Sequence, residues 1–236
     1  MLRILLGEQP SEWDEHTRET VQAIESFILL AGNYAKRRSE KAANFRKFAV
    51  RAEGVLRSLD ELEQSKYVAL RYAERIEHSR LTEMSPDEKL DYDRHVYFDK
   101  NAYIRVFSLL DKLGALLNDF LELNTSRMKP QFSYFTVLRN MRLNGLHSEL
   151  FPKLDEIKEK FREPMSRLRK RRNMEIHFMN AELQDDIVAV GEKASDRSHL
   201  ENIHANMADL DCGWAMVSDS LRLSLQYSCR RLRAMS

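Results

Sequence analysis

The residues best suited to chemistry lie together in the stretch RLRKRRNMEIH, residues 167–177. Asn173 follows Arg172 directly, and His177 comes four residues after the asparagine. A histidine titrates near neutral pH and can accept or donate a proton, and an arginine stabilises negative charge on phosphate oxygens. These side chains predict cleavage of a phosphodiester. The alternative interpretation makes Arg167–Arg172 the hydrated face of a helix and His177 a core histidine.

The spacing from arginine to histidine does not carry this prediction by itself. Among the four histidines that match this spacing, only His177 has an arginine, Arg172, that is followed by a carboxamide, and only this match lies in a basic run. His147 follows Gly145, which predicts a helix end. His78 and His204 lie in acidic stretches, which predicts surface histidines paired with glutamate. Four of the seven histidines follow an arginine with four to six residues between them: His78, His147, His177 and His204.

Positive charge is concentrated around the motif. The 236 residues carry a formal net charge of +1, but residues 127–177 contain thirteen Lys or Arg and six Asp or Glu, a local balance of +7. This excess favours a polyanion such as RNA as a partner. The same side chains spread around the circumference of several helices would form only a solvated surface, and both interpretations stay open.

Cysteine content and apolar runs predict a cytoplasmic protein without a membrane segment. Cys212 and Cys229 are the only cysteines and form no CxxC pair, which favours a reducing compartment. The apolar run at the start of the sequence is too short for a secretion signal. The longest other run, FILLAG, is too short to cross a bilayer.

The scarcity of glycine and proline predicts an all-α protein. The chain has seven glycines and five prolines, and its apolar residues mostly recur at helical spacing. No two glycines lie within twenty residues of each other. This separation excludes the glycine-rich phosphate loop and the dinucleotide-binding fingerprint, and with them nucleotide kinases and dehydrogenases.

Helix signals recur along the chain. In MSPDEK, Ser85 can cap a helix and Pro86 suits its first position. Residues 103–123 are apolar almost all the way round, as in the centre of a bundle. Helices are expected over about 12–38, 40–62 and 64–80, then from Pro86 onward, and over 103–123 and 133–143. A further helix is expected from Pro152 through the motif, and one or two more after Asp185, joined by EKASDRS.

An apolar stripe predicts how the helix that carries the motif packs. The register of this stripe leaves Arg169–Arg172 largely off the buried face of the helix and places His177 near the continuation of the stripe. Pro164 predicts a kink. The stripe consists of Leu154, Ile157, Phe161, Met165 and Leu168.

The segment RNMEIH resembles the signature of the HEPN superfamily (higher eukaryotes and prokaryotes nucleotide-binding domains): an Arg, a polar residue, three further residues and a His. The stretch YIRVFSLLDKLGALLNDF also resembles the long central helix of these domains. The resemblance covers about residues 90–182 and implies an all-α, antiparallel helical bundle of HEPN type with additional N-terminal helices. We therefore expect an N-terminal helical region at 1–84, the bundle core at 85–182, and C-terminal helices that pack on it at 183–236.

The resemblance also implies a function. Many HEPN domains are dimeric, metal-independent endoribonucleases of prokaryotic toxin or phage-defence systems, with a composite site where two motifs meet. For this chain, the resemblance implies a homodimer without cofactor or metal and a cognate antitoxin as a further partner. It also implies catalytic roles for Arg172, Asn173 and His177. Whether Arg171 or Arg172 is the functional arginine stays open. RNA is expected to contact the neighbouring cations Arg167, Arg169, Lys170 and Arg171.

Two alternatives belong to other classes. The same dimer could bind RNA, a nucleotide or a partner protein without cleaving anything. A bundle that holds two metal ions is the other alternative, and it needs two Glu-x-x-His pairs. The sequence has one such pair, Glu201 and His204, so we expect no metal.

Helix geometry constrains the nuclease hypothesis. Arg172 and His177 are five positions apart, which is about 140° around a regular helix. One such helix cannot easily direct both side chains at a single phosphate. The turn between them must therefore break, or a second copy of the chain must complete the site.

Overall fold

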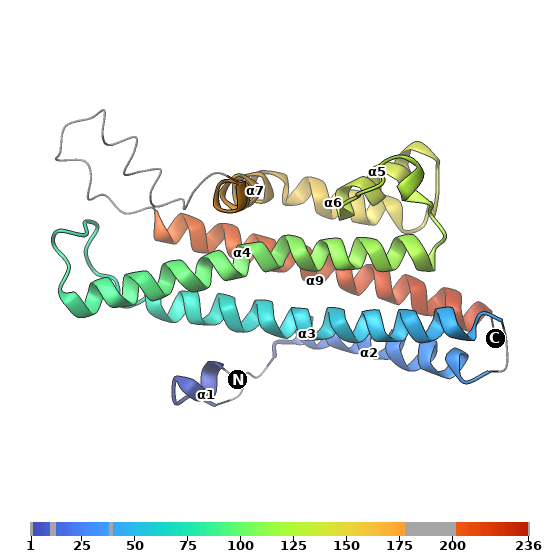
Figure 1. The fold of residues 1–236 in the computed structure, drawn as a ribbon, viewed down its shortest axis with the longest axis horizontal. Helices are drawn as coiled ribbons and strands as arrows, with labels where there is room; N and C mark the ends of the chain where they lie inside the picture. The colour runs from blue at the N-terminus through green and yellow to red at the C-terminus, as the bar shows by residue number, and fades with distance from the viewer. Residues whose placement is uncertain (1, 10–12, 38–39, 178–201, 236) are drawn as a thin grey trace. The chain divides into compact units, whose positions relative to one another are not determined.

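The computed structural model describes residues 2–9, 13–37, 40–177 and 202–235. The regular elements in these ranges are helices, which confirms the all-α prediction, and none of them is both long enough and apolar enough to cross a membrane. In chain order (Figure 1) they are α1 Leu2–Leu5, α2 Glu15–Ala35, α3 Ala42–Ala73, α4 Pro86–Phe120, η1 Thr125–Arg127, α5 Tyr134–Leu143, α6 Phe151–Lys160, α7 Arg162–His177 and α9 Ile203–Ala234.

Contacts between residues group the chain into two compact units, each drawn from several parts of the sequence. α3, α4 and α9 each contribute a stretch to both units. The domain boundaries predicted after residues 84 and 182 stay a prediction. The first unit comprises Met1–Pro10, Leu62–Arg105 and Arg162–Trp214, and the second comprises Ser11–Glu61, Val106–Phe161 and Ala215–Ser236.

α4 supplies the centre of the second unit. Phe120 of α4 lies edge to face against Phe27 of α2 and Phe48 of α3, with ring centroids 5.2 and 5.6 Å apart. The prediction that the apolar stretch 103–123 lies at the centre of packed helices is therefore confirmed. Its buried side chains in this unit include Val106, Leu109, Leu110, Leu113, Leu116 and Leu117.

A single buried tyrosine fixes α5 to α4 and α9. The hydroxyl of Tyr134 donates to Oγ of Ser220 on α9 at 3.1 Å, and burial raises the pKa of this phenol. The backbone nitrogen of Tyr134 donates to Asp111 of α4 at 3.0 Å. Its backbone also lies directly against Gly114, where a Cβ would come within 2.8 Å of the Tyr134 Cα. Glycine at this position therefore allows the close approach of α4 and α5.

Amide side chains hold the turn between α4 and α5. The backbone nitrogen of Thr125 donates to Oδ1 of Asn118 at 2.8 Å. Nδ2 of Asn140 donates to the carbonyl of Leu123 at 2.8 Å and to Oγ1 of Thr125 at 3.0 Å. Buried backbone groups need such partners, so these amides determine how the chain leaves α4.

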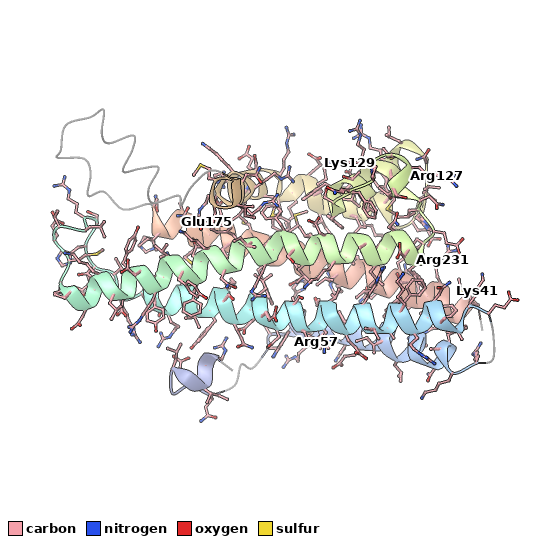
Figure 2. All side chains as sticks on the ribbon, in the orientation of Figure 1. Lys41, Arg57, Arg127, Lys129, Glu175 and Arg231 are labelled. Atoms are coloured by element: carbon pink, nitrogen blue, oxygen red, sulfur yellow. The ribbon has the colours of Figure 1, made fainter. Side chains whose placement is uncertain are left out.

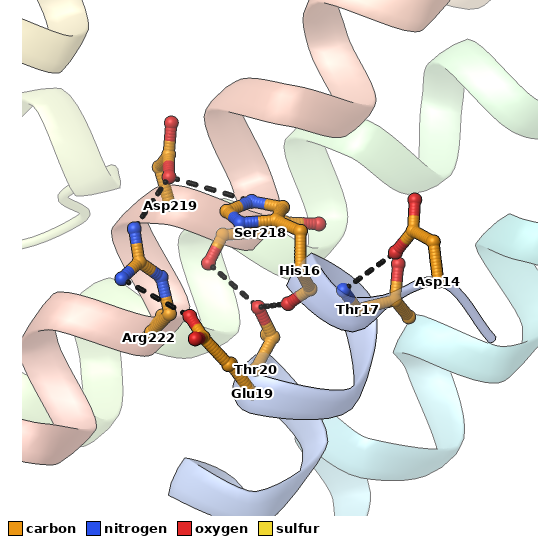
Figure 3. Close-up of polar contacts among 8 residues, drawn as sticks. All are labelled: Asp14, His16, Thr17, Glu19, Thr20, Ser218, Asp219 and Arg222. Carbon is orange, nitrogen blue, oxygen red and sulfur yellow. Dashed lines mark hydrogen bonds and ion pairs between the residues drawn. The ribbon is translucent and has the colours of Figure 1, made fainter.

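Polar contacts join α2 to α9 in the second unit, as Figure 3 shows. Oγ1 of Thr20 donates to the carbonyl of Ser218 at 3.4 Å. Arg222 of α9 forms ion pairs with Glu19 of α2 at 3.4 Å and with Asp219, one turn before it, at 3.1 Å. α2 is therefore attached to α9 by a hydrogen bond and by charge.

In the first unit α3 packs against α4 through polar and aromatic contacts. His95 is buried, and its Nδ1 donates to the carbonyl of Ala69 at 2.9 Å. Tyr72 of α3 stacks on Phe98 of α4 with ring centroids 6.3 Å apart. These contacts position the part of α4 that faces α7.

The helix starts at MSPDEK as predicted, but two predicted helix boundaries are wrong: the one between 62 and 64, and the end at Arg80, since α3 already ends at Ala73. α4 begins at Pro86, and the backbone nitrogen of Glu88 donates to Oγ of Ser85 at 3.2 Å. The helices predicted at 40–62 and 64–80 are one continuous helix, α3. Residues 62–65 contain no glycine or proline, and Leu62 and Ser65 are both buried, so nothing ends the helix there. The join predicted in EKASDRS lies outside the described residues.

A break at Phe161 replaces the kink predicted at Pro164. α6 ends at Lys160, and α7 begins at Arg162. A proline inside a helix clashes with the carbonyl four residues before it, here that of Lys160. With the break at Phe161, Pro164 lies in the first turn of α7, where backbone nitrogens have no partner within the helix in any case.

The contact between Gly114 and Tyr134 leads to a test of packing. We expect Gly114→Ala to lower the free energy of unfolding by about 1–3 kcal/mol, because the new methyl group meets backbone rather than a flexible side chain. Gly54→Ala in α3 is the matched control, since a Cβ there meets nothing within 4 Å. The control should raise stability by about 0.5–1 kcal/mol. Urea unfolding of both variants measures the difference, and equal effects would contradict the close packing.

Candidate active site

α7 carries the whole stretch RLRKRRNMEIH, and its inward face continues the apolar stripe. Leu168 is fully buried. Positions three, four and seven residues further along a helix lie on the same face, and these are Arg171, Arg172 and Glu175. The prediction that the cations lie off the buried face is therefore wrong for Arg171, whose side chain is only 14% exposed.

Arg171 forms an ion pair with Asp99 of α4. The Asp99 side chain is 3% exposed, and the guanidinium also lies over the ring of Tyr103, 4.7 Å from its centroid. A carboxylate buried to this extent needs a cationic partner, because an uncompensated charge in the interior is costly. The pair therefore fixes the rotation of α7 against α4.

Two further ion pairs hold α7 in the first unit. Glu175, labelled in Figure 2, pairs with Lys100 of α4 at 3.2 Å. Arg167 donates two hydrogen bonds to the buried carboxylate of Asp209 on α9, 2.7 and 2.6 Å long, and these bonds raise the pKa of Arg167. Arg167, Arg171 and Glu175 are four residues apart, so each successive turn of α7 carries one ion pair.

The four cations predicted to contact RNA fall into two pairs. Arg167 and Arg171 hold α7 through Asp209 and Asp99. Arg169 and Lys170 are exposed. The structure therefore gives the first two an anchoring role and presents the other two to solvent.

The three predicted catalytic residues all lie in α7. The side chains of Arg172 and Asn173 are half-buried, and His177 is the last residue of the helix, with its side chain outside the described residues. α7 is unbroken from Arg172 to His177, so these positions are about 140° apart around its axis. Asn173 and His177 are one turn apart and share a face. The helix thus brings together only two of the three positions.

The other described histidines that follow an arginine at this spacing lie in surroundings that indicate a structural role. Nδ1 of His78 lies 2.8 Å from the carboxylate of Glu88, and this hydrogen bond raises the pKa of His78, as expected for a surface histidine paired with glutamate. His204 is exposed near the start of α9. Glu201, its expected metal-binding companion, lies outside the described residues. Within those residues no three His, Cys, Asp or Glu side chains group as a metal site requires.

His147 lies just beyond the end of α5, as predicted. Its φ of 54° is left-handed, and its Nδ1 lies 2.9 Å from the hydroxyl of Tyr227 on α9. Burial, and then the positive charge of Arg231, lower the pKa of His147. The residue therefore terminates a helix and packs on α9.

Sequence reasoning missed the residues that hold the motif helix. Asp99, Lys100 and Tyr103 lie on α4, and Asp209 lies on α9. One signal was available, because Asp99 precedes the apolar stretch of α4, where a buried carboxylate requires a cation. The sequence did not indicate which cation this is.

Comparison with known proteins extends the resemblance found in the sequence. Residues 52–229 match the model of the Cthe2314-like HEPN family. The match is wider than the 90–182 expected from the motif and includes most of α3 and α9. Neither the curated proteins nor the solved structures gave a match.

The buried pair leads to a stability test. Arg171→Met should lower the free energy of unfolding by about 3–5 kcal/mol, because it leaves Asp99 as an unpaired buried carboxylate. The double variant Arg171→Met/Asp99→Asn should recover most of this loss. Lys170→Met is the matched control on the exposed side of α7 and should change stability by less than about 0.5 kcal/mol. Urea unfolding measures all three, and equal losses for Arg171 and Lys170 would contradict the anchoring role.

His147 leads to a prediction of pH dependence. Its pKa in the folded protein lies below the ordinary value of 6.5, so the unfolded chain binds a proton more readily near that pH. The free energy of unfolding should therefore fall as the pH drops below about 6.5. His147→Gln should flatten this fall, which urea midpoints at several pH values can measure. His78→Gln is the control: the pKa of His78 is raised, so its removal should not flatten the fall.

Proposed function

The chain belongs to the Cthe2314-like HEPN family, and on that premise we propose that it is a metal-independent endoribonuclease. Its active site is composite and is completed by α7 of a second copy. The observation that carries the proposal is the unbroken α7, which holds Arg172, Asn173 and His177 in the order of the HEPN signature. The alternative is a HEPN dimer that binds RNA, a nucleotide or a partner protein without cleavage, and the experiment below separates the two.

The chemistry uses the nucleophile that RNA itself carries. The 2′-oxygen attacks the phosphorus and forms a new O–P bond, while the bond from phosphorus to the 5′-oxygen breaks. His177 of one copy accepts the 2′-hydroxyl proton, and protonated His177 of the other copy donates a proton to the leaving 5′-oxygen. Arg172 stabilises the charge on the non-bridging oxygens, and Asn173 donates a hydrogen bond to phosphate or to the imidazole. The products are a 2′,3′-cyclic phosphate and a 5′-hydroxyl.

The contacts of Arg171 favour Arg172 as the functional arginine. Arg171 is held by Asp99 and by the ring of Tyr103. Turning its guanidinium toward a phosphate would leave Asp99 buried without its cation. Arg172 is the next residue and the one that Asn173 follows directly, so the catalytic role is assigned to it.

The helix geometry and an exposed apolar side chain support a second copy. Arg172 and His177 are about 140° apart on α7, so a second α7 is needed to surround one phosphate. Ile176, adjacent to His177, is 50% exposed. An exposed isoleucine beside the motif suits an interface between two copies.

Membership of the HEPN family supports a setting for the proposed reaction. We propose a cytoplasmic, prokaryotic toxin or phage-defence effector. Arg169 and Lys170 contact the RNA beside the scissile phosphate, and a cognate antitoxin protein would act by covering this surface. No cofactor takes part in the reaction.

Incubation of the purified protein with total RNA in EDTA tests the proposal. We expect cleavage that leaves 2′,3′-cyclic phosphate ends, and we expect His177→Ala and Arg172→Ala each to reduce the rate by about 100-fold or more. His204→Ala, an exposed histidine on α9, and Arg162→Ala, at the opposite end of α7, are matched controls that should cleave normally. Intact RNA with retained binding would favour the non-catalytic alternative instead.

A separate variant tests the composite site. Ile176→Glu should convert the dimer to a monomer in analytical ultracentrifugation and abolish cleavage, because it places charge in the proposed interface. Leu90→Glu is the matched control, since Leu90 lies on α4 in the same unit and is 48% exposed. A cleaving monomer would disprove the shared site.

A further inference from the structure

A cleft between α5 and α6 in the second unit combines apolar and cationic side chains. Its volume is about 370 Å³, within the range of small-molecule sites. Every residue that lines it belongs to residues 134–160, within the segment in which positive charge is concentrated. We infer that this cleft binds one unstacked nucleotide of single-stranded RNA, at a position distinct from the motif on α7. The inference rests on the proposed function for the source of the RNA.

The apolar part of the cleft suits a nucleobase. Phe135 and Leu143 are its accessible apolar side chains, Leu138 is only 2% exposed, and all three come from α5. Leu143 is 61% exposed and lies beside the charged side chains of the cleft. Exposure of an apolar side chain to water is unfavourable, so a ligand that covers Leu143 would be stabilised. A planar base covers such side chains and stacks on an aromatic ring. The cleft therefore offers a base a surface that a phosphate alone would not use.

The charged part of the cleft suits the phosphate attached to that base. Arg139 and Arg142 are exposed and three residues apart, so they lie on one face of α5. Lys158 of α6 is held by Asp155 at 2.9 Å and by Glu159 at 2.7 Å. The two arginines are thus the cations suited to a phosphate, which guanidinium groups bind with two parallel hydrogen bonds.

The cleft favours a single strand over a duplex. The bases of a duplex are stacked and paired, and their faces cannot enter an apolar cleft, whereas single-stranded RNA presents unstacked bases. α5 is also held firmly, because Tyr134 is bonded to Ser220 and packs against Gly114. A preformed site loses little conformational entropy on binding.

Binding of a labelled ten-nucleotide RNA, measured by fluorescence anisotropy in EDTA, tests the inference. All variants carry His177→Ala so that no cleavage interferes. Arg139→Glu/Arg142→Glu should weaken binding of the single strand by about tenfold or more. Leu143→Ala, which leaves charge unchanged, should weaken it by about threefold and leave binding of the same sequence as a duplex unaltered.

Matched controls separate the cleft from general electrostatic attraction. Arg127→Glu/Lys129→Glu makes the same charge change in the same basic segment, outside the cleft, at residues labelled in Figure 2. Leu29→Ala removes an equally exposed leucine, 65% exposed on α2. The charge control should weaken single-strand binding by less than about threefold, and Leu29→Ala should leave it unchanged. Thermal unfolding confirms that each variant is folded.

The outcomes distinguish this inference from the proposed function. Equal loss in the cleft variants and the charge control would overturn the inference, as would unchanged binding in the cleft variants. Binding of an acidic peptide in place of RNA would assign the cleft to a protein partner and also overturn it. Failure of the unsubstituted protein to cleave RNA would overturn the proposed nuclease while leaving the binding result intact.

Discussion

The buried ion pair between Arg171 and Asp99 is the contact on which the candidate site depends. It fixes the rotation of α7 about its own axis, and every other assignment on this helix follows from that rotation. Arg172 and Asn173 become half-buried, while Arg169 and Lys170 face solvent. Adjacent cations in one basic run therefore have different roles. The difference is imposed by a carboxylate that is 72 residues away in the sequence.

Local patterns were sufficient to predict where α4 begins and that its stretch 103–123 is buried among packed helices. The cap at Ser85 and the proline after it mark the start of α4 correctly, because both act through neighbouring backbone groups. The apolar stretch 103–123 predicts burial because no other placement removes its side chains from water. The break at Phe161 was displaced from the predicted kink by only three residues, since a proline constrains the residues before it.

Long-range pairing explains what sequence reasoning missed. The apolar stripe through Leu168 continues at Arg171 and Glu175. From sequence alone, a cation on a buried helix face is predicted to be solvent-exposed, because its buried partner is not known. The division of α3 into two helices failed for a related reason, because tertiary burial of Leu62 and Ser65 maintains the helix. The catalytic role of His177 stays a prediction. The family match to residues 52–229 supports the HEPN assignment independently of that residue.

The burial of the Arg171–Asp99 pair has a consequence for ionic strength. Dissolved ions screen exposed charges strongly and buried pairs weakly. Added salt therefore acts on Arg169 and Lys170, which face solvent, far more than on a pair whose side chains are 14% and 3% exposed. The proposed affinity of α7 for RNA would thus vary with the surrounding electrolyte while the helix keeps its orientation. The cations that face solvent and the cation that holds the helix thus lie within three consecutive residues, 169–171.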